Sequence, residues 1–155
     1  MSVERAKAHL AKYGAADRVV ELDSSCATVA LAARAIGCEG ARIAKTLSFK
    51  MSGSCILIVC AGDGRIDNKK FKARFNIKAS MPSADEVSAM VGHEVGGVCP
   101  FGINAGIDVY LDESLRRFEY VYPAAGSGNS MIKLSLPELE LFSGAKSWVD
   151  VCKLT

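Results

Sequence analysis

The sequence predicts an α+β fold: a compact single domain in which short helices surround a mixed β-sheet. Strand-like and helix-like stretches follow one another without the regular alternation of a doubly wound βαβ protein. The chain has 155 residues, of which 50% are hydrophobic and 23% charged, and this balance suits one globular domain with its own core. It contains no internal repeat, low-complexity segment or linker. We therefore expect residues 1–155 to form one domain.

The first part of the chain predicts two helices around a short strand. Residues 3–14 carry apolar side chains at helical spacing and end on a glycine. Residues 19–22 suit a strand. Ser25 or Thr28 is then expected to cap a second helix that runs to Ile36, with a glycine directly after it.

A hairpin and a basic helix are expected next. Residues 43–50 and 55–61 have strand-like apolar patterns, and the sequence M-S-G-S at 51–54 suits the turn between them. Asn68 is expected to cap a short basic helix that ends at Phe75.

Helix-start signals appear twice more in the second half. Ser83 and Glu86 form a capping-box pattern ahead of a helix to about Val91, and Ser135 with Glu138 form another. The remaining expected elements are a strand at 107–111, a helical turn capped by Asp112, and strands at 120–122 and 131–134.

Lys45 is a cation inside an apolar strand pattern. Alternation along the strand places Lys45 on the same face as Ile43 and Leu47, with Thr46 on the opposite face. A lysine among apolar neighbours either extends to solvent or meets an anion. The pattern therefore indicates either an anion-binding lysine or a solvated one on a half-exposed strand.

The segment at 92–102, G-H-E-V-G-G-V-C-P-F-G, predicts a shaped loop, since it holds four glycines and a proline. Glycine permits close approach of a ligand to the backbone and exposes N–H donors that can hold a developing oxyanion. The alternative is an elaborate structural turn. Neither the phosphate-loop pattern nor the dinucleotide-binding pattern of glycines is present.

A second stretch of small residues runs from 122 to 130, Y-P-A-A-G-S-G-N-S, between two expected strands. Asn129 or Ser130 could donate a hydrogen bond to a ligand. In the alternative, these side chains satisfy the backbone of their own turn.

The cysteines indicate buried reduced thiols rather than a metal site. None of the six forms a C-x-x-C pair, and neither His9 nor His93 stands at a zinc-ligand spacing from them. Cys99 follows His93 by six residues, which leaves a thiol nucleophile with a histidine base as an open alternative.

Charge limits the class of nucleic-acid contact. The formal net charge is only +2, so electrostatics alone would not hold a long nucleic acid, and any contact should be short or assisted by a partner. A basic run suits either phosphate contacts or a solvated helix face; its members are Arg65, Lys69, Lys70, Lys72 and Arg74. The sequence has no signal-peptide core and no window of roughly 18 apolar residues, so we expect a cytoplasmic protein without a membrane segment.

Taken together, these motifs resemble the YbaK / prolyl-tRNA synthetase-associated editing-domain family, which includes freestanding ProX-type members. The resemblance rests on I-A-K-T-L around Lys45, on the loop at 92–102 and on A-A-G-S-G-N-S at 124–130. The segments D-N-K-K-F-K at 67–72 and S-A-D-E-V at 83–87 also match, and the similarity extends over about residues 20–142.

The resemblance implies a mixed, barrel-like sheet and hydrolysis of the ester that joins an amino acid to the terminal adenosine of tRNA, with no cofactor and no metal. It implies catalytic roles for Lys45 and Gly97. The substrate-binding residues that it implies are Thr46, Gly96, Pro100, Phe101, Gly102, Tyr122, Gly128, Asn129 and Ser130. Because an acyl ester is already activated, backbone donors and an oriented water would suffice without a protein nucleophile.

The implied partners are the acceptor end of an aminoacyl-tRNA and, in addition, prolyl-tRNA synthetase. The expected substrate is tRNA(Pro) mischarged with a small amino acid such as cysteine or alanine. Ala124 stands where some family members carry serine, which leaves the identity of the amino acid open. Two alternatives remain: a non-catalytic tRNA- or synthetase-binding module of the same fold, and a cysteine hydrolase that acts through Cys99.

Overall fold

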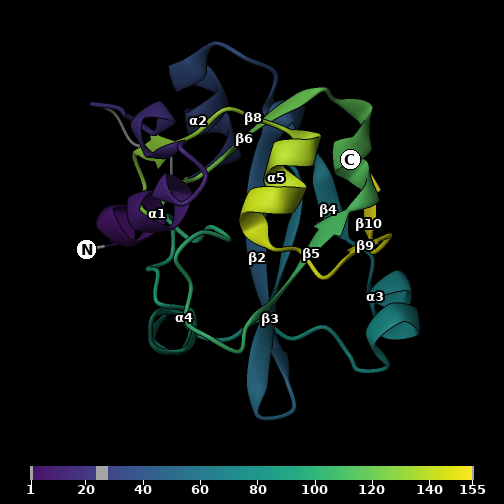
Figure 1. Cartoon of the computed structure of the whole chain (residues 1–155). Coiled ribbons are helices and arrows are strands. Elements are labelled where there is room, and N and C mark those ends of the chain that lie inside the picture. Colours follow the sequence, from purple (N-terminus) through teal and green to yellow (C-terminus); the bar gives the residue numbers. More distant parts are fainter. Residues whose placement is uncertain (1, 24–27, 155) are drawn as a thin grey trace.

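A six-stranded mixed sheet forms the centre of the protein, in the order β8-β6-β2-β3-β5-β9. The structure is a computed structural model that describes residues 2–23 and 28–154. The long hairpin of β2 (Ile43–Met51) and β3 (Ser54–Ala61) stands upright in the middle of Figure 1. The other strands of this sheet are β5 (Asp108–Asp112), β6 (Tyr120–Pro123), β8 (Leu134–Ser135) and β9 (Ser147–Val149).

This sheet contains two antiparallel pairs, β8–β6 and β2–β3, and three parallel pairs, β6–β2, β3–β5 and β5–β9. β2 and β3 are antiparallel, whereas β6 runs parallel to β2, and β5 runs parallel to β3. Two further pairs lie outside it: β1 (Val20–Glu21) with β7 (Ser130–Met131), and β4 (Gly64–Ile66) with β10 (Cys152–Leu154). The predicted α+β class with a mixed sheet is confirmed.

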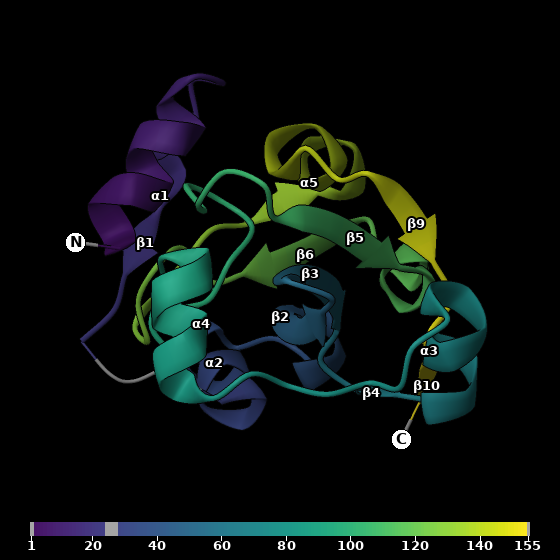
Figure 2. The same cartoon turned by 90° about the horizontal axis from the view of Figure 1, so that it is seen from below.

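Short helices surround the sheet. They are α1 (Ser2–Ala11), α2 (Val29–Ile36), α3 (Asn68–Phe75), α4 (Ala84–Val91) and α5 (Leu136–Ser143), with 3-10 turns at Ala16–Arg18, Gly40–Arg42 and Glu113–Arg117. Figure 2 shows α1, α2 and α4 gathered on one side of the hairpin and α3 on the other. β2 therefore lies between two surfaces, one formed by α1, α2 and α4 and the other by α3.

The helix caps follow the predicted chemistry closely. Thr28 accepts a hydrogen bond from Leu31 N at the start of α2, and Ser83 and Ser135 each complete a capping box. One prediction was wrong: Asp67, not Asn68, caps α3, because its carboxylate accepts from two backbone N–H groups of the first turn. The alternative cap Ser25 lies outside the described residues.

β3 is apolar on both faces because each face packs into a separate core. Leu57 and Val59 belong to the larger core, which also holds residues of α1, α4 and α5. Ile58 and Cys60 alternate with them and pack in a second core with Phe71 of α3. A strand buried on both faces reads as a continuous apolar run, as the sequence of β3 does.

The structure departs from the predicted strands at two points. The strand expected at 131–134 is divided, because residues 130–131 pair with β1 and residues 134–135 pair with β6. The short strands β4, β9 and β10 were not predicted, since two or three residues carry too little periodicity to be recognised.

Candidate active site at the open edge of strand β2

Over its middle, β2 has an edge that no strand in the described part of the chain covers. On this side β6 pairs only with Ile43 and Ala44 of β2, and β6 ends at that point. Further along, the backbone N–H of Lys50 donates to the carbonyl oxygen of Ser80 at 2.7 Å rather than to β3. In an antiparallel pair, alternate residues direct their backbone groups away from the partner strand, so Thr46 and Ser48 direct theirs to the same open edge.

A pocket of about 310 Å³ lies against this edge, and we call it the edge pocket. Its walls come from the start of α2, from the loop after α4, from β6 and β7, and from the segment before α4. Most of its lining is apolar: Val29, Ala32, Val87, Val95, Val98, Met81 and Met131. Its described lining includes no aspartate, glutamate or histidine, so a general base would have to come from elsewhere.

Lys45 lies at the mouth of the edge pocket on the face predicted from the sequence. It pairs with Cys60 in the ladder, and its neighbours Leu47 and Phe49 on that face pack in the second core. The Lys45 ammonium donates to the carbonyl oxygen of Gly62 over 3.5 Å, the outer limit of a hydrogen bond. No carboxylate of the described residues lies within ion-pair distance of it, so its charge can serve an anion.

The hydroxyl of Thr46 is buried and has no hydrogen-bond partner within the part of the chain that the structure describes. Thr46 also lines the edge pocket. A buried polar atom without a partner is costly unless a water or ligand satisfies it. This hydroxyl therefore marks a position where a bound molecule would gain a hydrogen bond.

The glycine-rich loop contributes to the edge pocket in part. Gly96 and Val98 line it, whereas Gly97 does not. The Gly97 N–H already donates to the carbonyl oxygen of Glu94 at 3.0 Å, so it is not free to hold an oxyanion. A β-carbon on Gly97 would come within 2.6 Å of Ser127 backbone atoms. The glycine is therefore needed for close contact between this loop and the turn at 124–130.

The end of the same loop packs away from the pocket. Pro100 and Phe101 are buried but do not line the pocket. Phe101 belongs to the larger core, and the centre of its ring lies 5.9 Å from the centre of the His9 ring. Gly102 has φ +66°, and a β-carbon there would collide with the backbone of Arg5 in α1. These three residues join the loop to the core and do not line the edge pocket.

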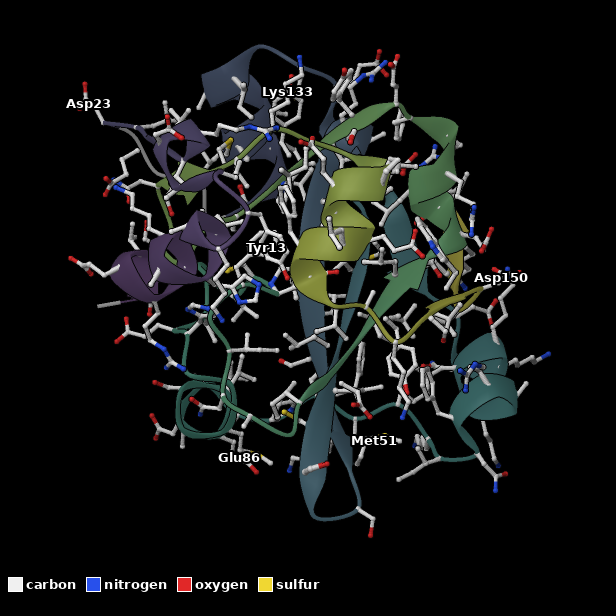
Figure 3. The ribbon with its side chains drawn as sticks, in the orientation of Figure 1. Tyr13, Asp23, Met51, Glu86, Lys133 and Asp150 are labelled. Carbon is white, nitrogen blue, oxygen red and sulfur yellow. The ribbon has the colours of Figure 1, made fainter. Side chains whose placement is uncertain are left out.

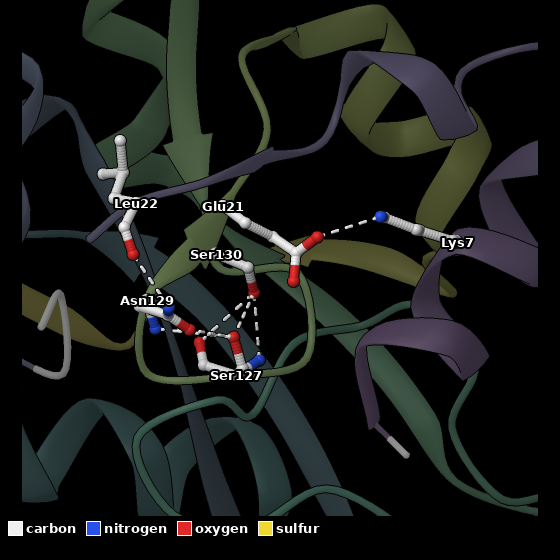
Figure 4. A network of polar contacts seen from close by, with 6 residues as sticks. All are labelled: Lys7, Glu21, Leu22, Ser127, Asn129 and Ser130. Atoms are coloured by element: carbon white, nitrogen blue, oxygen red, sulfur yellow. Dashed lines mark hydrogen bonds and ion pairs between the residues drawn. The ribbon is translucent and has the colours of Figure 1, made fainter. Parts of the chain in front are cut away.

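The turn at 124–130 is held by its own polar side chains, as Figure 4 shows. The Ser127 N–H and hydroxyl both bond Ser130 Oγ, at 3.0 and 2.8 Å, and Asn129 Nδ2 donates to the carbonyl oxygen of Leu22 at 2.8 Å. Ser130 and Tyr122 line the edge pocket, but Gly128 and Asn129 do not. The turn therefore positions one buried serine at the pocket wall.

Cys99 and His93 do meet, with Sγ 3.5 Å from Nε2. Both side chains are fully buried, and both bond the carbonyl oxygen of Phe101. Burial raises the pKa of the Cys99 thiol to about 12 and lowers that of His93. The Cys99 thiol is therefore held in its neutral form, which is a poor nucleophile. Both side chains are also closed off from solvent, and neither residue lines the edge pocket.

Several wall residues were not found from the sequence. Thr28, which caps α2, lines the pocket with Val29 and Ala32 of that helix, and so do Met81 and Pro82 ahead of α4. Apolar positions of a helix indicate a buried face but not which cavity they border. Met81 is 59% exposed in the structure, a property that its place before Pro82 in the sequence does not show.

Residues 2–23 and 28–154 contain neither a membrane-spanning helix nor a metal-binding cluster. No helix there is long and apolar enough to cross a membrane. No group of three or more histidine, cysteine, aspartate or glutamate side chains there is placed to hold a metal ion.

Residues 23–142 match the family model of the aminoacyl-tRNA editing domain. The chain belongs to this family. It is 50% identical over 154 residues to the "Uncharacterized protein YwhH" of Bacillus subtilis (strain 168), covering 99% of this chain and 98% of that one.

Two solved structures extend the comparison of this editing-domain protein. One is the crystal structure of a "putative trans-editing enzyme for prolyl tRNA synthetase", with a TM-score of 0.88 and 30% identity, covering 98% of this chain and 97% of that one. The other is "hypothetical protein APE2540", with a TM-score of 0.79 and 26% identity over 92% of this chain and 99% of that one. The fold of the editing domain is thus shared along nearly the whole chain.

Proposed function

We propose that this protein is a trans-editing aminoacyl-tRNA deacylase, which hydrolyses the ester of tRNA(Pro) mischarged with a small amino acid such as cysteine or alanine. The observation that carries the proposal is the edge pocket itself, an apolar cavity bounded by the open edge of β2 and by a lysine that has no carboxylate partner among the described residues. We take residues 1–155 as one editing domain that works in the cytoplasm, with prolyl-tRNA synthetase as a further partner.

The reaction needs few groups from the protein. Water adds to the ester carbonyl carbon, the bond to the ribose oxygen breaks, and the amino acid leaves as a carboxylate while the ribose oxygen takes a proton. The intermediate carries negative charge on the former carbonyl oxygen, and donors aimed at that charge lower the barrier. The backbone N–H groups of Thr46 and Ser48 at the open edge are suited to this task and replace Gly97, whose N–H is engaged.

The remaining residues of the site bind and orient the substrate. Lys45 would hold the phosphate or ribose of the terminal nucleotide, and the Thr46 hydroxyl would bond the aminoacyl group. Tyr122 and Ser130 form the opposite wall. With no acidic residue or histidine in the described lining, the water would be oriented by backbone carbonyls or by a hydroxyl of the substrate.

The size and polarity of the edge pocket favour a small side chain. Apolar side chains line most of it, so a large or charged acyl group would meet either a steric barrier or uncompensated desolvation. One methylene contributes only about 1–3 kcal/mol of discrimination, so a separate editing step is useful for amino acids that differ this little.

A deacylation panel tests the proposal. Wild-type protein is mixed with cysteinyl-, alanyl- and prolyl-tRNA(Pro) and with alanyl-tRNA(Ala), and release of labelled amino acid is compared with spontaneous hydrolysis. We expect rapid release from one of the mischarged tRNA(Pro) species and none above background from prolyl-tRNA(Pro). Tight tRNA binding without accelerated hydrolysis of any species would instead favour the non-catalytic binding module.

A further inference from the structure

A second pocket of about 340 Å³ lies beside the edge pocket, on the other face of β2. We call it the β4 pocket, because β4 and the start of α3 form its far wall. Its floor is apolar and consists of Leu47, Phe49, Ile66, Ala79 and Met81. Figure 2 shows β2 between α2 and α4 on one side and β4 and α3 on the other.

The two pockets meet at three residues. Lys45, Leu47 and Met81 line both of them, so a single cation stands at their junction. An extended molecule that places one end in the edge pocket can therefore continue into the β4 pocket past Lys45. In an aminoacyl-tRNA the acyl group is followed directly by a ribose, a base and a phosphate.

The rim of the β4 pocket carries positive charge that the protein does not neutralise. Arg65 is exposed at the rim, and its direct cross-strand partner in the β4–β10 ladder is Lys153. Within residues 2–23 and 28–154 neither forms an ion pair, although nearby Lys70 pairs with Asp150 at 3.1 Å. Like charges directly opposite each other in a ladder are destabilising.

The carboxylate of Asp67, the acidic residue next to this pair, is already engaged in capping α3. Its carboxylate accepts from Lys69 N and Lys70 N at the start of α3. These backbone hydrogen bonds, first that of Lys70, hold the pKa of Asp67 below its usual range, and the charge of Lys153 contributes. Among the described residues, Arg65 and Lys153 therefore face each other without a carboxylate of their own, and an anion from outside would pair with both.

The opposite end of the edge pocket offers less to an anion. The hollow there has an apolar lining together with two tyrosines, and its two cations are Arg18 and Lys133. Arg18 is already paired with Glu138 at 2.7 Å, and the Lys133 ammonium lies 4.6 Å from the centre of the Tyr120 ring. Figure 3 places Lys133 at the α2 end of the molecule, far from Asp150 beside α3.

We infer that the β4 pocket binds the 3′-terminal nucleotide of the tRNA, with its base on the apolar floor and its phosphate between Arg65 and Lys153. The inference rests on the proposed function for the identity of the ligand. Apolar surface that covers a base, together with unpaired cations along the backbone path, is how single-stranded nucleic acid is commonly held. The exposed Asn68 at the rim has an amide suited to the edge of an adenine.

The test measures binding of an uncharged oligonucleotide, so it does not depend on hydrolysis. The probe is a fluorescent trinucleotide of sequence CCA with a free 3′ end, followed by anisotropy at several salt concentrations. The variants are Arg65→Glu and Lys153→Glu, with Lys12→Glu, directly after α1, as the matched charge reversal and Lys133→Glu for the opposite end. All four positions are exposed or at the surface, and thermal unfolding checks each fold.

We expect Arg65→Glu and Lys153→Glu each to weaken CCA binding about tenfold or more and to reduce the logarithmic salt slope by about 0.7. Lys12→Glu and Lys133→Glu should bind within about twofold of wild type. Since Arg65→Glu places opposite charges across the ladder, its melting temperature should not fall, which separates lost binding from lost structure.

Unchanged CCA binding in both Arg65→Glu and Lys153→Glu overturns the inference, and so does a loss confined to Lys133→Glu. Absence of CCA binding by the wild type also overturns it. If CCA binding depends on Arg65 but no mischarged tRNA is hydrolysed, the nucleotide site stands and only the deacylase proposal fails.

Discussion

A single unsatisfied hydroxyl, that of Thr46, is the most specific residue-level feature of the edge pocket. It is buried within a strand and lacks a partner in the described part of the chain, where polar atoms of this kind are normally bonded. Folding alone gives no reason for a hydroxyl there, because valine would fill the same volume. A bound aminoacyl group would give a reason for the hydroxyl, because it would accept or donate a hydrogen bond there.

Thr46→Val should therefore lower kcat/KM on the best substrate by about two- to tenfold, the value of one hydrogen bond of about 0.5–1.5 kcal/mol. The melting temperature should stay the same or rise, since no bond within the protein is lost. Thr46→Ser, which keeps the hydroxyl, is the control and should stay within about twofold of wild type. A drop in stability without a drop in turnover would assign Thr46 to the fold alone.

Cys99 is a second residue whose environment decides its role. Cys99→Ala should retain most of the deacylase activity, because the thiol is fully buried outside the pocket. A folded pKa of about 12, against 9.0 for the free thiol, means that the protein stabilises the neutral form. This contribution is complete below pH 9 and is lost as the pH rises toward 12.

The free energy of unfolding of wild type should accordingly fall more steeply above pH 9 than that of Cys99→Ala, as measured by urea unfolding at several pH values. A covalent acyl-enzyme trapped on Cys99, or a folded but inactive Cys99→Ala, would revive the cysteine-hydrolase alternative.

At the scale of elements, the open edge of β2 depends on how two loops meet. The 92–102 loop and the 124–130 turn approach so closely at Gly97 that only a hydrogen fits between Gly97 and Ser127. The pocket wall at Gly96 and the buried Ser130 are both positioned by this contact. We therefore expect Gly97 to act through structure, a different role from that implied by the family resemblance.

Gly97→Ala should destabilise the protein by about 1–3 kcal/mol, the usual cost of forcing extra volume into a packed site. The control is Gly40→Ala, where a new β-carbon would meet only a valine methyl at 3.4 Å. Thermal unfolding alongside turnover makes the comparison. If Gly97→Ala keeps its melting temperature but loses turnover, Gly97 acts at the ester instead.

The elements also show what local sequence determines. Capping boxes at Ser83 and Ser135 were predicted because the interacting groups lie within four residues. The β4–β10 pair was not predicted, since its register joins residues almost 90 positions apart, such as Arg65 and Lys153. Pairing over such a distance is set by the packed cores and leaves little trace in a three-residue segment.

The same division applies to the candidate site. Strand alternation correctly placed Lys45 and Thr46 on opposite faces of β2. It could not reveal that β6 leaves β2 after Ala44, which opens the edge. Likewise, a glycine-rich sequence indicates that another group approaches the backbone closely, but it does not say which group. At Gly102 that group is the backbone of α1 rather than a ligand.

At the scale of the whole molecule, a net charge of +2 conceals an uneven distribution. Many surface cations are paired with carboxylates, as Arg18 is with Glu138 and Arg117 is with Asp63. Lys45 and Arg65 both border the β4 pocket and form no ion pair within residues 2–23 and 28–154, and they lie along one path from the edge pocket to β4. This arrangement suits a short contact with the end of one nucleic-acid strand.

The deacylation rate of Lys45→Ala tests the central claim most directly. Lys50→Ala is its matched control: Lys50 lies on the same strand, but its side chain is half exposed and pairs with Glu86 outside the pocket. Both rates are measured in single turnover on the best mischarged tRNA, with melting temperatures alongside. We predict that Lys45→Ala falls by about 10² or more while Lys50→Ala stays near wild type, both with unchanged folds. A Lys45→Ala protein that deacylates at nearly the wild-type rate would contradict the account.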